Sequence, residues 1–356
     1  MQNSIVSRLL RALLLKGSVI ESPIIRNPAM RTLIPLVFIS LLSTSAVAQS
    51  YEGPMTEWGV PDFQGVWKHA TIMPFERPVE LGEKRAYTEQ EAVELERAVQ
   101  QRFDLANEPL DPGRAAPDIA ESLPSLGNYD LFWREDAKFI PTIDGEFRTS
   151  AITSPANGRM PERVVGFAER MSARQANQPG RNDGPEGRGL GERCLLNGNF
   201  SSPVMRPSIY NSHLQLTQSP GYVSLTTEMS HDTRIIKITD KHNPAAAAQR
   251  KWMGDSIGRW EGDTLVVETK YFNNWQTLRG IPIENLTLIE TFKRDSDRKI
   301  IYGFTVNDPS VFTDDFTGEY PLSKIDEEIY EYACHEGNYG MTGILIGARR
   351  LESDAE

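Results

Sequence analysis

The sequence predicts a mostly-β protein in which short antiparallel strands form a meander that closes as a barrel or folds as a sandwich. From residue 208 onward, runs of β-forming residues alternate with turn residues at regular intervals. Within one run, Ile300, Tyr302, Phe304 and Val306 alternate with polar or small residues, which indicates a strand with one buried face. Before residue 208 the pattern changes to two helical stretches separated by long loops.

The stretch Trp252–Phe272, WMGDSIGRWEGDTLVVETKYF, is central to this prediction because Glu261-Gly262-Asp263 separates a tryptophan-bearing arm from a run of β-forming residues. The same reasoning, applied to the remaining turns, gives predicted strands at 208–218, 222–229, 233–238, 263–272, 286–294, 299–307 and 327–335. We therefore expect the barrel strands to occupy 208–350.

Residues 49–207 are predicted to form a helical and loop-rich wrap that belongs to the same domain as the barrel strands. Thr88 with Glu91 three residues later forms a capping box, which predicts a helix over 89–106. Asp144-Gly145 predicts the turn of a hairpin over 140–149. Pro161 fits the first turn of a second helix over 161–175, and residues 61–67 are predicted to enter a short strand.

Residues 1–48 read as an N-terminal extension followed by a signal peptide. Arg31 precedes the apolar run 33–47, and Ala46-Val47-Ala48 matches the small-residue pattern of a cleavage site. The alternative is a membrane anchor, but the run is shorter than the ~20 residues that a spanning helix needs. We expect cleavage after Ala48, a periplasmic or extracellular protein, and no membrane association after cleavage.

The chain has two cysteines, Cys194 and Cys334. In an oxidising compartment such a pair is either a disulfide or two buried thiols, and we expect the disulfide. A cysteine-ligated metal is not predicted, because neither cysteine has a second cysteine or a histidine at metal-binding spacing.

The formal net charge of −11 over 356 residues argues against a nucleic-acid partner and against binding to anionic lipid. The sequence contains no serine-hydrolase, zinc-protease, P-loop or dinucleotide-binding motif. We therefore expect no cofactor and no metal, and a small organic molecule as the partner; the oligomeric state stays open.

Glu290 is the clearest candidate catalytic residue. It shares its predicted strand face with Leu286, Leu288 and Phe292, so alternation places a carboxyl group on the buried side. A carboxyl group there must be paired, or else burial raises its pKa, which suits general acid–base chemistry near neutral pH.

A second group lies at His231, Asp232 and Arg234. Asp232 and Arg234 are two residues apart on a predicted strand, so they face the same way and can pair, while His231 is expected to face apolar surroundings. The alternative is structural: a histidine bonded to a carbonyl at a strand end, beside a stabilising ion pair.

His335 follows the predicted strand 327–335 and precedes a glycine turn, a position where functional residues are common. Glu331 shares its face, and His231, His335 and Glu331 are the residues that a two-histidine, one-carboxylate metal site would use. We take His335 as a catalytic candidate. The candidate binding residues are Tyr222, Asp232, Trp260, Glu268 and Glu331.

Four segments carry a resemblance to a known family: PDFQGVW (61–67), GYVSLTTEMSHDTRII (221–236), WMGDSIGRWEGDTLVVETKYFN (252–273) and YEYACHEGNYGM (330–341). Over about residues 55–350 the chain resembles a family of secreted bacterial proteins of unassigned function. The resemblance implies a lipocalin-like β-barrel behind a signal peptide and assigns no catalytic residues. The chain departs from the family pattern at 239–251, in an outer loop.

The leading hypothesis is a cofactor-independent acid–base enzyme, a lyase, isomerase or hydrolase, that acts in a barrel cavity. Glu290 and His231 would carry protons, and Arg234 would stabilise charge. The alternative is a non-catalytic lipocalin-like protein that binds a small hydrophobic ligand. A third possibility is an interaction protein of the cell envelope, which would present an apolar surface patch instead of a cavity.

Overall fold

The fold comes from a computed structural model that describes residues 51–106, 113, 137–196 and 204–354. All described residues belong to one compact unit of the chain. The predicted targeting segment 1–48, with its cleavage site, lies outside the described residues.

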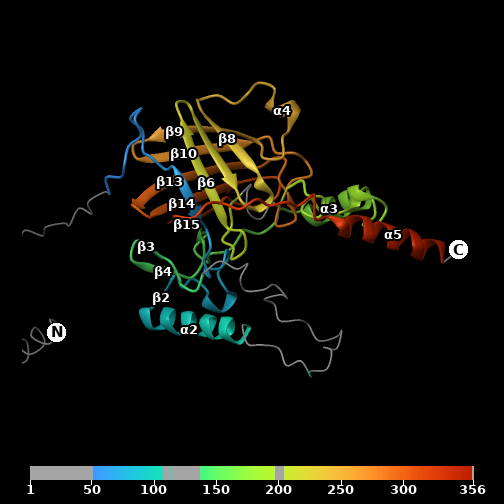
Figure 1. The fold of residues 1–356 in the computed structure, drawn as a ribbon, viewed down its shortest axis with the longest axis horizontal. Helices are drawn as coiled ribbons and strands as arrows, with labels where there is room; N and C mark the ends of the chain where they lie inside the picture. Colours follow the sequence, from blue (N-terminus) through green and yellow to red (C-terminus); the bar gives the residue numbers. More distant parts are fainter. Residues whose placement is uncertain (1–50, 107–112, 114–136, 197–203, 355–356) are drawn as a thin grey trace, which may run out of the picture. The chain divides into compact units, whose positions relative to one another are not determined.

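A closed β-barrel forms the body of the described chain (Figure 1). Its strands follow one another around the barrel in the order β1 (Gly65–Lys68), β6 (His213–Ser219), β7 (Tyr222–Thr227), β8 (Thr233–Ile238), β9 (Asp255–Glu261), β10 (Thr264–Lys270), β13 (Thr287–Ser296), β14 (Lys299–Asn307) and β15 (Phe316–Ile325). The last strand, β15, pairs with the first, β1, and this pairing closes the barrel. The predicted mostly-β barrel is therefore confirmed.

Barrel closure depends on β1, which comes from the segment predicted to wrap around the barrel. Trp67 is opposite Leu214 of β6 on one side and Lys324 of β15 on the other. The strand β1 ends 145 residues before β6 begins. The local sequence pattern could not predict this closure, because it does not specify which strands pair.

The barrel is a mixed sheet, because β8 and β9 run parallel while the other neighbours around the barrel are antiparallel. A parallel pair requires a connection that returns to the starting end of the sheet. The long connection between the two strands, which contains α4 (Ala246–Gln249), makes that return. By contrast, β9 and β10 form a tight hairpin in which Gly262 takes a left-handed φ of 62°.

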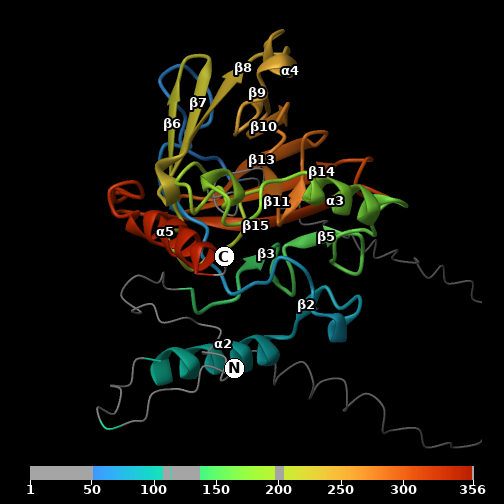
Figure 2. The same cartoon turned by 90° about the vertical axis from the view of Figure 1, so that its right-hand side faces the viewer.

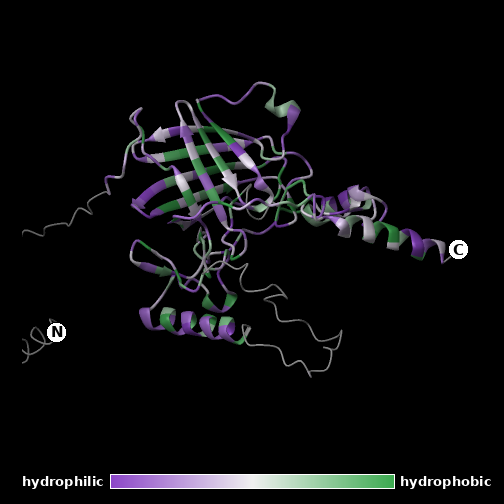
Figure 3. Cartoon of the chain, in the orientation of Figure 1, coloured by the Kyte–Doolittle hydropathy of each residue, from purple (hydrophilic) through white to green (hydrophobic). Residues whose placement is uncertain are grey.

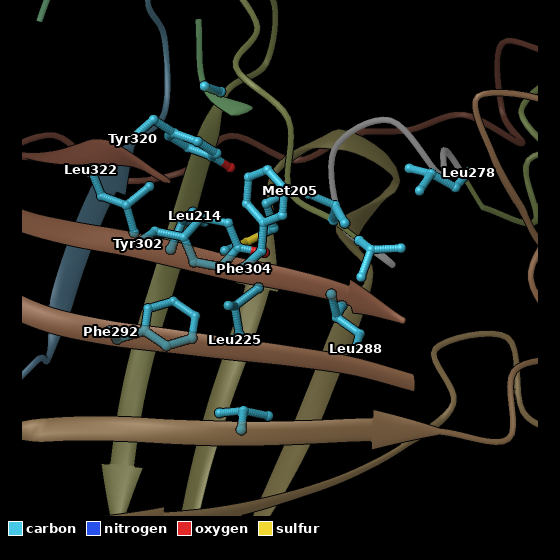
Figure 4. Close-up of a cluster of buried hydrophobic side chains, with 14 of the residues drawn as sticks. Met205, Leu214, Leu225, Leu278, Leu288, Phe292, Tyr302, Phe304, Tyr320 and Leu322 are labelled. Carbon is cyan, nitrogen blue, oxygen red and sulfur yellow. The ribbon is translucent and has the colours of Figure 1, made fainter. Parts of the chain in front are cut away.

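Side chains alternate between the interior and the surface along the long strands, as the hydropathy colouring of Figure 3 shows. The interior is lined by apolar and aromatic side chains that pack against one another (Figure 4). Around Tyr302, ring centroids of Phe292, Phe304 and Tyr320 lie 5.2, 6.1 and 5.1 Å away. Aromatic packing of this kind contributes to stability beyond the area it buries.

The N-terminal part contains the predicted helix and hairpin. Helix α2 is Glu89–Ala106, and its capping box is formed: the backbone NH of Glu91 donates to Thr88 Oγ1 (3.2 Å), and the Thr88 NH donates to Glu91 Oε2 (2.8 Å). The hairpin consists of β3 (Thr142–Ile143) and β4 (Glu146–Arg148), and β4 also pairs with β2 (Ala86–Tyr87). A short strand, β5 (Ile152–Ser154), adds to the outer edge of β15.

Two predicted elements differ in the structure. Helix α3 is Phe167–Ala176 and begins six residues after Pro161, because Arg163 instead makes a β-bridge with Phe312. The predicted strand 327–335 is wrong: residues 326–338 contain no strand, and the helix α5 (Tyr339–Ser353) follows. The barrel is closed by the pairing of β1 with β15, so this segment is not part of the closure.

The disulfide between Cys194 and Cys334 is present, as expected, and joins residues 140 positions apart. The remaining short elements are β11 (Thr277–Leu278), β12 (Ile281–Pro282), and the 3-10 turns η1 (Val79–Leu81), η3 (Pro185–Gly187) and η4 (Met229–His231). None of the helices in the described residues has the length and apolar character needed to cross a bilayer.

Candidate functional site

Two of the predicted catalytic residues, Arg234 and Glu290, meet inside the barrel. Arg234 lies on an inward position of β8 and Glu290 on an inward position of β13, and both are buried. The guanidinium donates to both carboxylate oxygens, at 2.6 and 2.9 Å, and the Tyr302 hydroxyl donates to Glu290 Oε1 at 2.8 Å. The predicted inward orientation of Glu290 is confirmed. We call Arg234, Glu290, Tyr302 and Tyr320 the interior cluster.

The electrostatics of the interior cluster favour a charged pair. Burial acts to lower the pKa of Arg234, but the charge and hydrogen bonds of Glu290 raise it more, so the net pKa lies above its ordinary value. Burial and the Glu290 charge together hold the pKa values of Tyr302 and Tyr320 well above the usual 10. Both oxygens of Glu290 already accept hydrogen bonds, so a proton-transfer role would require the ion pair to break.

The interior cluster has two polar atoms without a hydrogen-bond partner among the described residues, the Tyr320 hydroxyl and Arg234 Nε. The rings of Phe292, Phe304 and Tyr320 pack around the Tyr302 ring (Figure 4). A buried polar atom without a partner costs free energy, so it is either a strained position or a site that a water or ligand oxygen occupies.

His231 does not join this cluster. It lies on the turn η4, where Ser230 and His231 take positive φ angles of 62° and 42°, and its side chain is exposed. Its Nδ1 lies 3.0 Å from the carbonyl oxygen of Tyr332. The expectation that it faces apolar surroundings is wrong, because the left-handed turn interrupts strand alternation and β8 starts only at Thr233.

The predicted pairing of Asp232 with Arg234 is also wrong. Asp232 precedes β8 and is half-buried, whereas the guanidinium of Arg234 points inward to Glu290. Glu331 and His335 are exposed in the strand-free segment 326–338, so alternation gives them no common buried face. The structure therefore does not bring His231 and His335 to the buried Glu290.

A buried carboxylate that sequence reasoning missed ties this segment to the barrel. Glu228 accepts hydrogen bonds from His213 Nδ1 (3.1 Å), Asn211 Nδ2 (2.7 Å) and the backbone NH of Tyr330 (3.1 Å). Burial acts to raise the pKa of Glu228, but these hydrogen bonds lower it to a net value below the ordinary range. The position carried no distinctive sequence signal, since its partners come from two other segments, Asn211 with His213 and Tyr330.

Glu268, a predicted binding residue, belongs to a cluster on the outer face of the barrel. His242 places Nδ1 2.8 Å from Asp255 Oδ2 and Nε2 2.9 Å from Glu268 Oε1, and Lys270 Nζ lies 2.7 Å from the same Glu268 oxygen. His242 comes from the β8–β9 loop, and both of its partners, Asp255 and Glu268, lie on strands that follow the loop. This cluster fastens the loop to β9 and β10.

Trp260 and Tyr222, two further predicted binding residues, line one shallow recess of about 90 Å3. The Trp260 ring packs against Phe63 at 5.5 Å, and the Tyr222 side chain is exposed. The recess has room for about one small group, so it is a minor candidate site.

A larger pocket of about 330 Å3 lies between α3 and two loops at the ends of the barrel strands. Figure 2 views the molecule from the right-hand side of Figure 1, and α3 lies in front of the barrel in this view. We call it the rim pocket, and its lining residues are Phe167, Arg170, Met171, Arg174, Pro282, Glu284, Asn285, Asp308, Ser310 and Val311. Its volume lies within the range of small-molecule sites. None of the predicted site residues lines it.

Asp308 is the most perturbed acidic group in the rim pocket. It is buried, and Oδ1 accepts hydrogen bonds from the backbone NH (3.1 Å) and hydroxyl (2.6 Å) of Ser310. Burial raises the pKa of Asp308 above its ordinary value, and the charge of Glu284 adds to the increase, although the Ser310 hydrogen bonds oppose it. The sequence signal for this site was weak: Asp308 is followed by Pro309, which indicates only a turn.

The comparisons add no family assignment. Neither the models of protein families nor the curated protein sequences gave a match to this chain. Among the described residues, no group of three or more histidine, cysteine, aspartate or glutamate side chains is arranged to hold a metal ion. The function must therefore be argued from the geometry of the sites described above.

Proposed function

We propose that this protein is an exported, non-catalytic binding protein for a small organic molecule, and that the rim pocket is its binding site. The observation that carries the proposal is the pocket itself: about 330 Å3, with apolar walls and a few convergent polar groups. The pocket is formed by α3 and the β12–β13 and β14–β15 connections, so a closed barrel holds two of its three walls in place.

Binding is favoured over catalysis through Glu290 and His231 by the environments of these two residues. Glu290 is buried in an ion pair among aromatic rings, and His231 is exposed on a surface turn. General acid–base catalysis needs both groups within hydrogen-bond reach of one substrate. The rim pocket does not depend on either residue.

A second candidate function, acid–base catalysis, rests on Asp308 instead. A buried carboxyl group with a raised pKa, placed in the wall of a ligand-sized pocket, has the properties of a general acid. Under this alternative Asp308→Asn would abolish turnover of a ligand while leaving its affinity within a few-fold. A binding protein would show no turnover in the first place.

The binding proposal is tested by filling the rim pocket. Met171 is a half-buried wall residue on α3, so Met171→Trp should occupy the pocket without disturbing the barrel core. We expect a panel of small organic compounds, screened by ligand-observed NMR, to yield binders whose affinity falls at least ~10-fold in Met171→Trp, or about 1.4 kcal/mol.

The matched control is Met55→Trp, because Met55 is 58% exposed and lies outside the pocket. This variant should bind as the original protein does. Circular dichroism and the thermal midpoint of each variant establish that it is folded. Binding that persists unchanged in a folded Met171→Trp variant would overturn the proposal, as would a panel with no binder.

A further inference from the structure

We infer that the ligand of the rim pocket is a carboxylate with an apolar body, and that Arg170 receives its anionic group. This inference rests on the proposed function and adds the chemical class of the ligand. The inference follows from which charged side chains around Phe167 form ion pairs and which do not. Phe167 is an aromatic residue in the wall of the pocket.

Two guanidinium groups lie close to the Phe167 ring. Arg163 lies 5.8 Å and Arg170 lies 5.9 Å from its centroid, and Arg163 also lies 4.3 Å from the centroid of Phe312. Cation–π contacts hold such groups in place without neutralising their charge. The aromatic wall of the pocket is therefore accompanied by two positive charges.

Neither arginine has a carboxylate partner within the described ranges. Arg170 Nη2 donates to the carbonyl oxygen of Ser310 at 2.6 Å, and Arg163 Nη1 donates to the carbonyl oxygen of Pro161 at 3.3 Å. Arg174, the other arginine of the pocket, differs, because it is paired with Glu284 at 2.9 Å. Among the described residues, Arg170 is thus the exposed cation that lines the pocket without an ion pair, and Arg163 lies near the same ring.

The acidic groups near the pocket already have partners. Glu284 pairs with Arg174, and Asp308 Oδ1 accepts hydrogen bonds from the backbone NH and the hydroxyl of Ser310. Glu76, the next carboxylate along the rim, pairs with Arg279. Burial lowers the pKa of Arg163; the nearby charge of Glu76 opposes this change, and the charge of Arg279 adds to it.

The local charge contrasts with that of the whole chain, whose formal net charge is −11. An anion gains nothing from the protein as a whole, so its recognition requires a local positive site. A guanidinium fits a carboxylate through two parallel hydrogen bonds. Phe167, Met171, Pro282 and Val311 supply apolar contacts for the body of the ligand. An arylalkyl carboxylate combines these two features.

The experiment compares 4-phenylbutyrate with its neutral amide, 4-phenylbutyramide, by isothermal titration calorimetry at low salt. We expect the original protein to bind the acid at least ~10-fold more tightly than the amide, which corresponds to about 1.4 kcal/mol. In Arg170→Gln the preference for the acid should disappear while the affinity for the amide stays within a few-fold. Added salt should weaken binding of the acid alone.

The control is Arg97→Gln, which removes one exposed positive charge from α2, outside the pocket, and should keep the preference for the acid.

Inorganic phosphate serves as a second probe. If phosphate binds as tightly as the acid, the apolar body of the ligand contributes nothing to the affinity, and the assignment to a carboxylate with an apolar body fails.

The outcomes separate this inference from the proposed function. Equal affinity for acid and amide, both lost in Met171→Trp, would overturn the assigned ligand class while the binding function stands. The same applies if Arg170→Gln keeps the preference for the acid. If neither compound binds although the compound panel yields binders, the inference alone falls. If Met171→Trp binds both compounds normally, the proposed function and the inference fall together.

Discussion

Arg234 on β8 and Glu290 on β13 face each other across the interior of the barrel, joined by two hydrogen bonds although 56 residues separate them in sequence. Both groups are almost completely removed from water. The pair therefore has a large desolvation cost that only its mutual attraction offsets, which makes each partner depend strongly on the other.

Replacing one partner of this pair should destabilise the fold more than replacing both. We expect Glu290→Gln and Arg234→Met each to lower the free energy of unfolding by roughly 3–5 kcal/mol, because a buried charge is left uncompensated. The double variant Arg234→Met, Glu290→Met should lose less than the sum of the two single losses. Denaturant unfolding measures all three, and strictly additive losses would contradict the pairing.

The two interior tyrosines provide a matched comparison. Tyr302 donates to Glu290 at 2.8 Å, whereas the hydroxyl of Tyr320 has no partner among the described residues, and both side chains are fully buried. Tyr302→Phe should cost roughly 1–3 kcal/mol of unfolding free energy, and Tyr320→Phe should be neutral or stabilising. Equal losses in the two variants, measured by urea unfolding, would show that the Tyr320 hydroxyl has a partner in solution.

His69 should make stability depend on pH in the weakly acidic range. Burial lowers its pKa to about 4, so the unfolded chain takes up a proton near pH 6.5 while the folded protein does so only near pH 4. The unfolded state binds more protons between these values, so stability is lost as pH falls from 6.5 to 4, by roughly 3 kcal/mol in total.

The measurement is the difference in unfolding free energy between the original protein and His69→Gln at several pH values. Taking the difference removes the contribution of carboxylates such as Glu228, whose lowered pKa makes stability fall in acid through a separate titration. The gap between the two proteins should narrow as pH falls from 6.5 to 4. A gap independent of pH would refute the assigned cause.

The disulfide between Cys194 and Cys334 closes a long loop, with a sequence separation of 140. In the chain-entropy model, a loop of this length contributes up to ~4–5 kcal/mol by restricting the unfolded chain. We expect the double variant Cys194→Ser, Cys334→Ser to unfold at a clearly lower denaturant concentration than the oxidised protein. The original protein in excess reductant should match the variant; identical midpoints in oxidised and reduced protein would rule out this contribution.

Elements with a local cause were predictable. The helix 89–106 follows from a capping box and helical spacing, and the hairpin around Asp144-Gly145 follows from residues that accept positive φ angles, here 51° and 78°. The inward position of Glu290 follows from period-two alternation along one uninterrupted strand. Each of these features depends on residues within about ten positions of one another.

Features that depend on distant partners were not predictable in the same way. The expected strand at 327–335 has strand-like residues, but the distant strand β1 pairs with β15 and closes the barrel without it. His231 lies one residue after a left-handed Ser230, and a single such turn shifts the face of every following side chain. The rim pocket draws on α3 and two loops more than 100 residues farther along the chain.

The sequence by itself determined that the described chain is rich in short amphipathic strands, that it carries two cysteines able to pair, and that Glu290 points inward, because side-chain alternation and turn chemistry act over a few residues. Only the tertiary structure decided that Arg234 pairs with Glu290 instead of Asp232, that β1 closes the barrel, and that Arg170 lines a pocket. These outcomes depend on which distant segments meet. Those contacts are determined by the burial of apolar surface in the complete fold, which no short stretch of sequence specifies.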